Sequence, residues 1–403
     1  MIDFELTEEH KAVRKMVRDF VAKEIIPNSS KWDKEHRVDY DLTKKMGDLG
    51  ILGICIPEKY GGAGLDYISL AIACEELEYG ESSFRVIMSV HLGLNSCGLL
   101  QWGTEEQKMK YLKPQAQGTK LAAFCLTEPG AGSDVQSIET TAVKKGDKYI
   151  LNGTKAWISL ATVADHYLVF AYTDKSKKAH GISAFIVEKT FPGVTSKDYE
   201  NKLGVRSGST GEVNFNNVEV PAENLVGQEG EGFKIAMTCL DNGRFTVGSG
   251  SVGLAKASLD ASLKYCQERK TFGKEIGRHQ LVQQHIANMV RGIESAELLI
   301  WRAGWMKNQG IRNTRETALA KWVATTVAQD CANSAIQIHG AYGFSGDYPV
   351  ERFWRNSRGA VIYEGTNEIQ TIMQGEYALG YRKDKPLNKE LPPYPLPDDF
   401  FKE

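Results

Sequence analysis

Two short runs in the middle of the chain decide the fold: Tyr167-Leu168-Val169-Phe170-Ala171-Tyr172 and Ile182-Ser183-Ala184-Phe185-Ile186-Val187. Both are rich in β-branched and aromatic residues, and so is the earlier run Lys148-Tyr149-Ile150-Leu151. Gly, Asn and Asp residues that form turns separate the three runs. We therefore expect an antiparallel β-domain, most simply a barrel, over residues 121–231.

The sequence on both sides of this block has helical periodicity. Near the N-terminus, Val13, Met16, Val17 and Phe20 form an apolar stripe at helical spacing, and residues 1–120 read as a helical domain. Four long amphipathic segments follow the β-rich block, at residues 232–269, 279–309, 313–341 and 365–382. They predict an antiparallel four-helix bundle over residues 232–383. The fold class is therefore α+β and mostly α.

The last segment, residues 384–403, holds five prolines and cannot continue a helix. We expect this proline-rich tail to be a flexible terminus, with an extended strap on a neighbouring subunit as the alternative.

Composition indicates an ordinary soluble protein. The 403 residues are 42% hydrophobic and 25% charged, and the net charge of −2 gives no electrostatic reason for a nucleic-acid or membrane partner. No apolar run reaches the ~18 residues of a membrane span, and the start, Met1-Ile2-Asp3-Phe4-Glu5, lacks the features of a signal peptide. The seven cysteines are scattered without a C-x-x-C pair, so no metal site is indicated and we expect a reduced, cytoplasmic protein.

The stretch Tyr363-Glu364-Gly365-Thr366 carries the most promising acid–base group. Glu364 stands between an aromatic residue and a glycine, at the end of an apolar run, where partial desolvation would raise its pKa toward that of a general base. Gly365 lets the backbone approach a ligand, and Thr366 can cap the next helix. The alternative is a helix-capping loop with a solvated glutamate.

Two further stretches lie in the β-rich block. Phe124-Cys125-Leu126-Thr127-Glu128-Pro129-Gly130-Ala131-Gly132-Ser133-Asp134 lacks the pattern of a nucleotide-triphosphate loop, but could serve the edge of a flat cofactor or a carbonyl. Asn152-Gly153-Thr154-Lys155-Ala156-Trp157-Ile158-Ser159 predicts a type I′ turn followed by an indole in the next strand. A core tryptophan is the alternative for Trp157.

Two stretches lie in the predicted bundle. Glu268-Arg269-Lys270-Thr271-Phe272-Gly273-Lys274 ends a long helix, where its cations either cap the helix or hold a pyrophosphate. In Ala335-Ile336-Gln337-Ile338-His339-Gly340-Ala341-Tyr342-Gly343, His339 could be a general acid, but packing is favoured because no partner spacing is nearby.

In their order and spacing, these five stretches resemble the acyl-CoA dehydrogenase family of flavoproteins, over about residues 3–382. The resemblance implies a helical domain, a β-barrel and a four-helix bundle, assembled as a homotetramer, with FAD between the β-domain and the bundle. The implied FAD contacts are Phe124, Leu126, Thr127, Ser133, Trp157, Ile158 and Ser159, then Arg269, Phe272, Gln280, Gln337 and Gly340 of a neighbouring subunit, with Thr366 and Glu368. The implied substrate contacts are Arg85, Ser133, Asp241, Arg244, Tyr363 and Gly365.

The resemblance also implies the reaction. Glu364 would remove the α-proton of an acyl-CoA thioester, while its own backbone N–H and a flavin ribityl hydroxyl polarise the carbonyl. The β-hydrogen would leave as hydride to flavin N5, and an electron-transferring flavoprotein would accept the electrons. Some members place the base near the position of Gly243, which here supplies no carboxylate.

Arg85, in Ser82-Ser83-Phe84-Arg85-Val86-Ile87-Met88-Ser89-Val90, departs from the straight-chain pattern of the family and resembles glutaryl-CoA dehydrogenases. There the matching arginine binds the distal carboxylate, and a guanidinium fork suits a carboxylate. An unpaired buried charge costs roughly 3–5 kcal/mol, so Arg85 would also disfavour neutral chains. The alternative is that Arg85 pairs with one of the preceding acids, Glu75, Glu76 or Glu78.

The acyl group therefore stays open. A glutaryl-CoA-like or benzylsuccinyl-CoA-like substrate fits Arg85, whereas a neutral short or branched acyl-CoA such as butyryl-CoA is the main alternative. Val86 resembles enzymes that only dehydrogenate and Tyr363 those that also decarboxylate, so loss of carbon dioxide is undecided. A non-catalytic flavoprotein that only binds, and an oxidase, remain as further alternatives.

Overall fold

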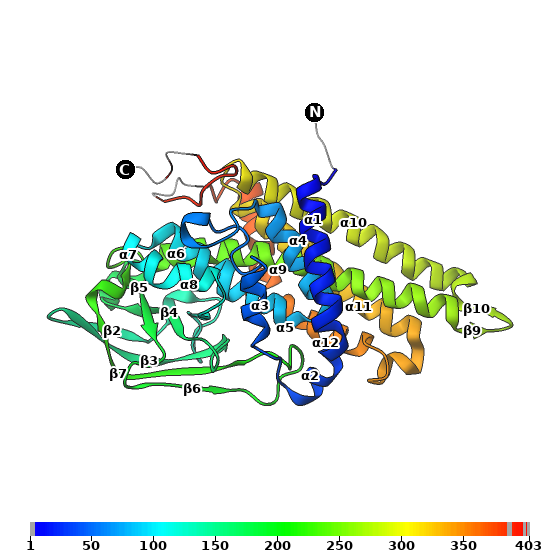
Figure 1. Ribbon diagram of the computed structural model, residues 1–403, viewed down its shortest axis with the longest axis horizontal. Helices are drawn as coiled ribbons and strands as arrows, with labels where there is room; N and C mark the ends of the chain where they lie inside the picture. Colours follow the sequence, from blue (N-terminus) through cyan, green and yellow to red (C-terminus); the bar gives the residue numbers. More distant parts are fainter. Residues whose placement is uncertain (1–4, 385–388, 398–399, 401–403) are drawn as a thin grey trace.

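The computed structural model describes residues 5–384, 389–397 and 400 (Figure 1). The molecule is elongated (Figure 1). Along the chain, an N-terminal helical region is followed by a region of β-strands and then by a C-terminal helical region. The predicted fold class is confirmed: a mostly helical protein with a central β-sheet region. The predictions that rest on Met1 to Phe4, and part of those on the tail, lie outside the described residues.

The N-terminal region consists of helices joined by short turns and π-helical segments. Its helices are α1 (Glu8–Phe20), α2 (Ser29–Glu35), α3 (Leu42–Asp48), α4 (Tyr67–Gly80), α5 (Ser82–Ile87), α6 (Cys97–Trp102), α7 (Glu105–Gln107) and α8 (Lys113–Ala116), with π-helical turns at Val21–Ile25, Met88–Ser96 and Lys108–Leu112. Thr7 caps α1 in a capping box with His10. Helices α4 to α6 are buried almost along their whole length, which makes them the wall against which the rest of the molecule packs.

The sheet lies at one end of the molecule (Figure 1). Its strands are β1 (Ala122–Cys125), β2 (Thr141–Lys145), β3 (Lys148–Ser159), β4 (His166–Tyr172), β5 (Ile182–Glu188), β6 (Val194–Asp198), β7 (Thr210–Pro221) and β8 (Leu225–Val226), in the order β6-β7-β3-β2-β4-β5-β8, with β1 on β4. Most pairings are antiparallel, but β1 and β2 pair with β4 in parallel. The order ends at β6 and β8, so no pairing between them closes the described strands into a ring.

The predicted type I′ turn at Asn152-Gly153 is wrong. The strand β3 runs through both residues and reaches Trp157, which therefore lies in the same strand and not in the next one. A bulge sits between Leu151 and Gly153 in the pairing with β7. The Asn152 side chain accepts a hydrogen bond from the Asn217 N–H at 2.8 Å, so its polar group satisfies the neighbouring strand instead of a turn.

The C-terminal region is built on three long helices. They are α9 (Gly232–Glu268), α10 (Gln280–Asn308) and α11 (Thr314–His339). The small hairpin of β9 (Lys270–Thr271) and β10 (Lys274–Glu275) lies between α9 and α10, and the shorter helices α12 (Val350–Ala360) and α13 (Asn367–Ala378) follow α11. Helix α9 packs on α11, on α10 and on the N-terminal α4. It therefore joins the two helical regions.

The sequence did not predict α12, because its inner face is largely polar. Arg355 is buried and pairs with Asp33 at 2.6 Å and with Glu351 at 2.7 Å, while Arg352 lies 3.6 Å from Glu81. Buried ion pairs replace the apolar stripe that marks the other helices. The pairs fasten α12 to the N-terminal region and so place the loop that follows it.

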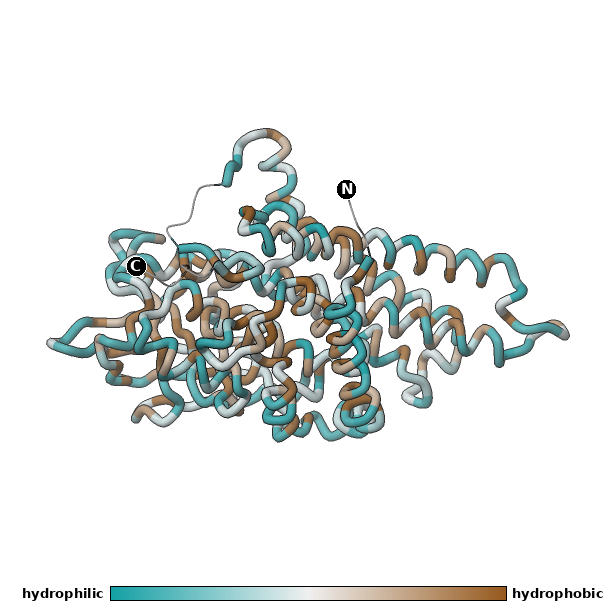
Figure 2. Tube along the Cα trace, turned by 45° about the horizontal axis from the view of Figure 1, so that its top comes forward, coloured by the Kyte–Doolittle hydropathy of each residue, from teal (hydrophilic) through white to brown (hydrophobic). Residues whose placement is uncertain are grey.

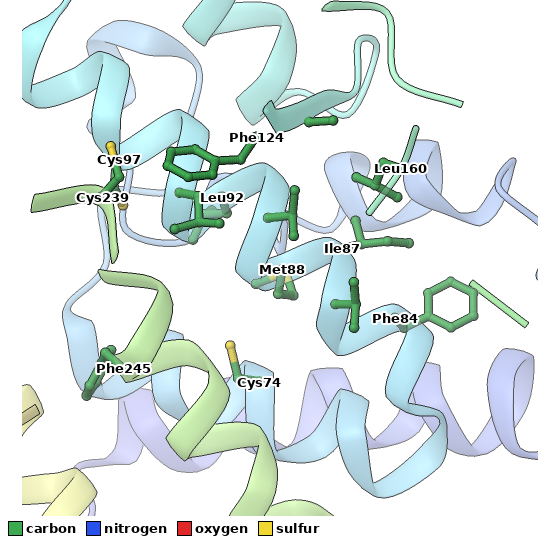
Figure 3. Packing of buried hydrophobic residues seen from close by; sticks show 14 of the residues in the cluster. Cys74, Phe84, Ile87, Met88, Leu92, Cys97, Phe124, Leu160, Cys239 and Phe245 are labelled. Atoms are coloured by element: carbon green, nitrogen blue, oxygen red, sulfur yellow. The ribbon is translucent and has the colours of Figure 1, made fainter. Parts of the chain in front are cut away.

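One continuous hydrophobic core runs through all three regions. In Figure 2 the hydrophobic stretches concentrate inside the body, whereas the two tips of the molecule are hydrophilic. Figure 3 shows Phe84, Ile87, Met88 and Leu92 along one helical run, with Phe124 of the sheet on one side and Phe245 of α9 on the other. The helical run that carries Arg85 is thus clamped between the sheet and the bundle.

The described part of the tail, residues 389–397, packs against the helical regions of the same chain. The Tyr67 hydroxyl donates to the Pro392 carbonyl at 2.9 Å, Gln101 donates to the Lys389 carbonyl at 2.6 Å, and the Tyr394 N–H donates to the Asn308 carbonyl at 2.8 Å. The expectation of a flexible terminus is therefore wrong for these residues. Buried polar groups such as the Tyr67 hydroxyl need partners, and the tail backbone supplies them.

The described residues contain no helix that is both long enough and apolar enough to span a membrane. All seven cysteines are buried free thiols.

Candidate active site

Glu364 lies in a tight loop between α12 and α13. Its backbone is left-handed, with a φ of 53°, which is uncommon for a residue with a side chain. The loop is held on both sides, since Tyr363 N–H donates to the Gly359 carbonyl at 3.1 Å and Asn367 N–H donates to the Val361 carbonyl at 3.0 Å. Thr366 caps α13 by accepting from Ile369 N–H, as predicted.

The Glu364 carboxylate is aimed into the protein at Gly243 of α9. A Cβ built on Gly243 would stand 3.1 Å from the Glu364 Cδ and closer still to Oε2, so only glycine leaves room for this carboxylate. Oε2 is buried and has no hydrogen-bond partner among the described residues. A buried carboxylate oxygen without a partner is costly, which points to a ligand or substrate as its missing partner.

Burial raises the pKa of Glu364 to about 7, against the opposing effect of Arg85, Lys321 and Arg244, which favour the carboxylate. The pKa of an efficient general base lies near the working pH. The structure therefore gives Glu364 the burial that the sequence motif suggested, and the alternative of a solvated glutamate is wrong.

Arg85 lies deep beside this loop, with only 1% of its surface exposed. Its Nε donates to Glu78, its Nη1 donates to the Ser89 hydroxyl at 3.1 Å, and its Nη2 donates to the Tyr363 hydroxyl. Burial by itself would lower the pKa of Arg85, but Glu78 and Tyr363 raise it above its ordinary value. The guanidinium is charged, and of the three acids that the sequence offered, Glu78 is its partner.

The network around Arg85 also depends on a missing side chain. A Cβ on Gly250 of α9 would lie 2.7 Å from the Arg85 Cδ. Two glycines about two turns apart on α9 thus make room, Gly243 for the carboxylate and Gly250 for the guanidinium.

Arg244 and Asp241 lie next to each other on α9. Arg244 donates to Asp241 at 2.8 Å, and Thr314 donates to the other oxygen of Asp241 at 2.6 Å. Arg244 Nε is buried without a partner among the described residues, although it lies close to Gly365. The structure therefore brings together Glu364, Gly365, Tyr363, Arg85, Arg244 and Asp241.

Trp157 is not a core residue. Its side chain is 64% exposed, its φ is 58°, and its ring packs on Tyr199 with centroids 4.7 Å apart. Phe124, Leu126 and Ile158 are buried beneath, whereas Thr127, Ser159 and Ser133 keep some exposure. A Cβ on Gly130 or Gly132 would meet nothing within 4 Å, so the loop before Ser133 borders open space.

A buried ion pair ties these two stretches together. Lys155 Nζ donates to the Glu128 carboxylate at 2.7 Å and to the Leu126 carbonyl at 3.0 Å. The same carboxylate accepts from the Glu139 and Thr140 N–H groups at 2.6 and 3.1 Å. The pair therefore fixes the loop after β1 against β3, and the motif positions of Glu128 and Lys155 have a structural reason.

Two of the remaining predicted FAD contacts, Thr366 and Glu368, lie at the start of α13, directly after Glu364. The other five lie at the opposite end of the molecule, around the β9–β10 hairpin (Figure 1). They are the exposed residues Arg269, Phe272, Gln280, Gln337 and Gly340, at the adjoining ends of α9, α10 and α11. Phe272 is 94% exposed at the tip. His339 is nearby but buried, with Nδ1 2.8 Å from the Ala335 carbonyl and its ring stacked on Tyr265, so it is a packed histidine as favoured.

Sequence reasoning missed one residue of the site, Lys321 of α11. Its side chain is fully buried and its Nζ donates to the Gly365 carbonyl at 2.9 Å. A signal was present, because Lys321 falls on the same helical face as Thr317, Ala318, Ala324 and Thr325, all of them buried.

Three family models match the chain in succession: acyl-CoA dehydrogenase N-terminal domain at residues 7–119, middle domain at 123–218 and C-terminal domain at 230–378. The mitochondrial short-chain specific acyl-CoA dehydrogenase of Rattus norvegicus is 43% identical over 379 residues, 94% of this chain and 92% of that protein. Glutaryl-CoA dehydrogenase of Desulfococcus multivorans is 41% identical over 387 residues, 95% and 99% of the two chains.

A solved chain from work on the electron transferring flavoprotein of Acidaminococcus fermentans and flavin-based electron bifurcation superimposes with a TM-score of 0.92. It is 45% identical and covers 94% of this chain and 100% of its own. Fold, buried carboxylate and matches together define a flavin-dependent oxidoreductase. The chain belongs to the acyl-CoA dehydrogenase family, and its cofactor is FAD.

A substitution at Gly243 tests whether the position of the Glu364 carboxylate matters for the reaction. The substitution Gly243→Ala should displace the Glu364 carboxylate and lower the rate of flavin reduction by acyl-CoA at least about 100-fold, since small misplacements of reacting groups have effects of that size. The rate is measured by anaerobic stopped-flow absorbance. Gly375→Ala is the control, because its Cβ would meet nothing within 4 Å. An unchanged rate in Gly243→Ala would contradict the assignment.

Proposed function

We propose that this enzyme dehydrogenates an acyl-CoA whose acyl chain ends in a carboxylate, with Glu364 as the base for the α-proton and Arg85 as the group that receives the distal carboxylate. The observation that carries the proposal is the position of the unpartnered Glu364 carboxylate beside a buried, charged arginine. The two groups are linked directly, because the Tyr363 hydroxyl accepts a hydrogen bond from Arg85 and Tyr363 directly precedes Glu364.

The pairing of Arg85 with Glu78 is compatible with this role. Glu78 occupies Nε, whereas the two terminal nitrogens hold only neutral hydroxyls, those of Ser89 and Tyr363. A guanidinium can bind a carboxylate through the edge formed by its terminal nitrogens, and hydroxyls can rotate to accept or donate. The edge that faces Tyr363 therefore suits a carboxylate of the substrate.

The same pairing weakens one argument against neutral substrates. Because Glu78 compensates the charge of Arg85, a neutral acyl chain would not leave that charge wholly unpaired. A short neutral acyl-CoA such as butyryl-CoA is therefore the second candidate, and the short-chain specific relative supports it.

The residues divide the work of the reaction as follows. Glu364 takes the α-proton on Oε2, the oxygen that packs against Gly243 and has no hydrogen-bond partner among the described residues. Trp157 and the loop of residues 126–133 would hold FAD, which supplies the acceptor for the β-hydrogen. The Glu128–Lys155 pair keeps that loop in place, and Arg244 with Asp241 would meet the CoA portion.

We also propose a homotetramer that passes its electrons to an electron-transferring flavoprotein. The residues expected at the adenosine end of FAD lie at the far tip of the bundle, away from Trp157, so a second copy would bring its tip to the first copy's sheet (Figure 1). The likeness to a chain studied with an electron transferring flavoprotein supports that class of acceptor.

Replacing the base gives the first test of this function. Glu364→Gln should keep FAD but reduce it with any acyl-CoA roughly 10²–10⁴-fold more slowly, the usual contribution of a general base. In the unaltered enzyme the rate should rise with pH through about 7, since Glu364 must lose its proton to act. Glu376→Gln, on the helix α13 that follows the Glu364 loop, is the control, and equal rates in the two variants would exclude Glu364 as the base.

A comparison of two thioesters tests the substrate. Glutaryl-CoA should reduce the flavin with a kcat/KM at least about 10-fold above that of butyryl-CoA, and Arg85→Gln should reverse this order by removing a charge-assisted bidentate contact. Arg18→Gln, which alters an exposed arginine on Glu76, is the control. Equal reduction by both thioesters in the unaltered enzyme would assign the protein to neutral short chains. The mass of the product shows whether carbon dioxide is lost.

A substitution at the tip of the bundle tests the proposed homotetramer. Phe272→Ser should yield smaller particles in analytical ultracentrifugation and a protein that loses FAD on dilution. The Phe272 ring is exposed in the single chain, and the proposed contact with a second copy would bury it, so that serine removes this buried apolar surface. Met109→Ser, at an exposed apolar side chain of the N-terminal region, should leave both properties unchanged. A tetramer with full FAD content in Phe272→Ser would contradict the proposed contact.

A further inference from the structure

A buried lysine holds the loop that carries Glu364. Lys321 lies on α11 with 0% of its surface exposed, and its Nζ donates to the Gly365 carbonyl at 2.9 Å and to the Asn367 side-chain oxygen at 3.1 Å. Gly365 directly follows Glu364, and Asn367 is the first residue of α13. One ammonium group therefore connects α11 to both ends of the turn after Glu364.

The contact is reinforced by neighbours without charge. Gln370 also donates to the Gly365 carbonyl, at 2.9 Å, and Thr325 donates to the Asn367 oxygen at 3.0 Å. The left-handed backbone of Glu364 persists only where the surroundings fix it. These donors supply that constraint, but only Lys321 brings a charge.

Several charged groups face Lys321 and Glu364 from the surrounding elements. Arg244 comes from α9 and Glu368 from α13, with Arg358 of α12 next to Glu368. Arg85 of α5 and Tyr363 also act on Glu364, while α4 contributes Cys74 and, through Arg85, Glu78. Helix α10 presents the apolar Ile300 where α9 and α11 meet at Gly248.

We propose that Lys321 is a positioning residue for the dehydrogenation: it fixes the carbonyl of Gly365 and the start of α13, keeps the Glu364 carboxylate facing Gly243, and favours its ionised form. This inference rests on the proposed role of Glu364 as the base. Lys321 touches neither substrate nor cofactor in this assignment, and acts only through the loop.

The electrostatic part follows from how the two groups share one site. Burial lowers the pKa of Lys321 to about 7, with Glu364 acting in the opposite direction, and burial raises the pKa of Glu364 to about 7. Each charge therefore stabilises the other in a place that excludes water. Removing the lysine charge leaves the carboxylate less well compensated, so its pKa must rise.

Two variants separate the hydrogen bond from the charge. Lys321→Met removes both, and Lys321→Gln removes the charge while it keeps a donor of similar reach. In the FAD-loaded enzyme, both should move the midpoint of the pH–rate curve for flavin reduction upward by roughly one unit, the size of a single nearby charge. Lys321→Met should also lower the plateau rate at high pH. Thr325→Val, which loses only uncharged contacts, those of its hydroxyl to the Asn367 side chain and to the Lys321 and Trp322 carbonyls, should leave the midpoint in place.

A second measurement does not depend on turnover. The infrared band of the protonated Glu364 carboxyl, identified by its absence in Glu364→Gln, is titrated in the oxidised enzyme without substrate. Its midpoint should move upward in both lysine variants, as the rate curve does. Unmoved midpoints in folded, FAD-loaded Lys321→Gln would overturn the inference. If Glu364→Gln itself kept the full rate, the proposed base would fail instead, and the infrared titration would still decide whether Lys321 sets the ionisation of Glu364.

Discussion

The close approach of α9 to its neighbours is the constraint on which the site depends. Three glycines make it possible: Gly243 opposite Glu364, Gly248 where α11 comes within 3.2 Å of a Cβ position, and Gly250 against Arg85. Glycine inside a helix is unfavourable by roughly 0.5–1 kcal/mol relative to alanine, so each position weakens α9 on its own. The tight packing that the glycines permit, and the groups that fill the spaces, offset that loss.

Ionisable side chains fill two of those spaces, Glu364 at Gly243 and Arg85 at Gly250, which is unusual for a protein interior. Arg85 and Glu78 compensate each other as a pair, and Glu128 and Lys155 do the same under the sheet. Glu364 differs, because one of its oxygens has no partner. Its pKa is raised on folding, so the folded state holds a proton that the unfolded chain releases, and stability falls as pH rises from the ordinary glutamate range to about 7. The group that we propose as the base is thus a group that weakens the fold.

Local patterns predicted the parts of this arrangement that local sequence controls. The short β-rich runs gave β4 and β5, and Thr366 caps α13 as its position before the helix suggests. The partner of Arg85 could be narrowed to three acids but not chosen, because Glu75, Glu76 and Glu78 are adjacent and only the rotation of α4 separates them. The turn predicted at Asn152-Gly153 was wrong because the neighbouring strand supplies the hydrogen-bond partner of the Asn152 side chain. Helix α12 was not predicted because ion pairs, and not an apolar stripe, form its buried face. Both depend on residues distant in sequence.

The contact between Tyr363 and Arg85 bears on the proposed substrate in a way that neither the Glu364 motif nor Arg85 does separately. Tyr363 links the two, since its hydroxyl accepts from Arg85 while its backbone leads into the left-handed turn at Glu364. A substrate group that displaced this hydroxyl from Arg85 would therefore act directly on the residue before the base. A distal carboxylate has the geometry to take over the terminal nitrogens of the guanidinium, whereas a methyl end has no group to offer them. In the proposed function, recognition of the far end of the acyl chain and placement of the base are in this way coupled through one side chain.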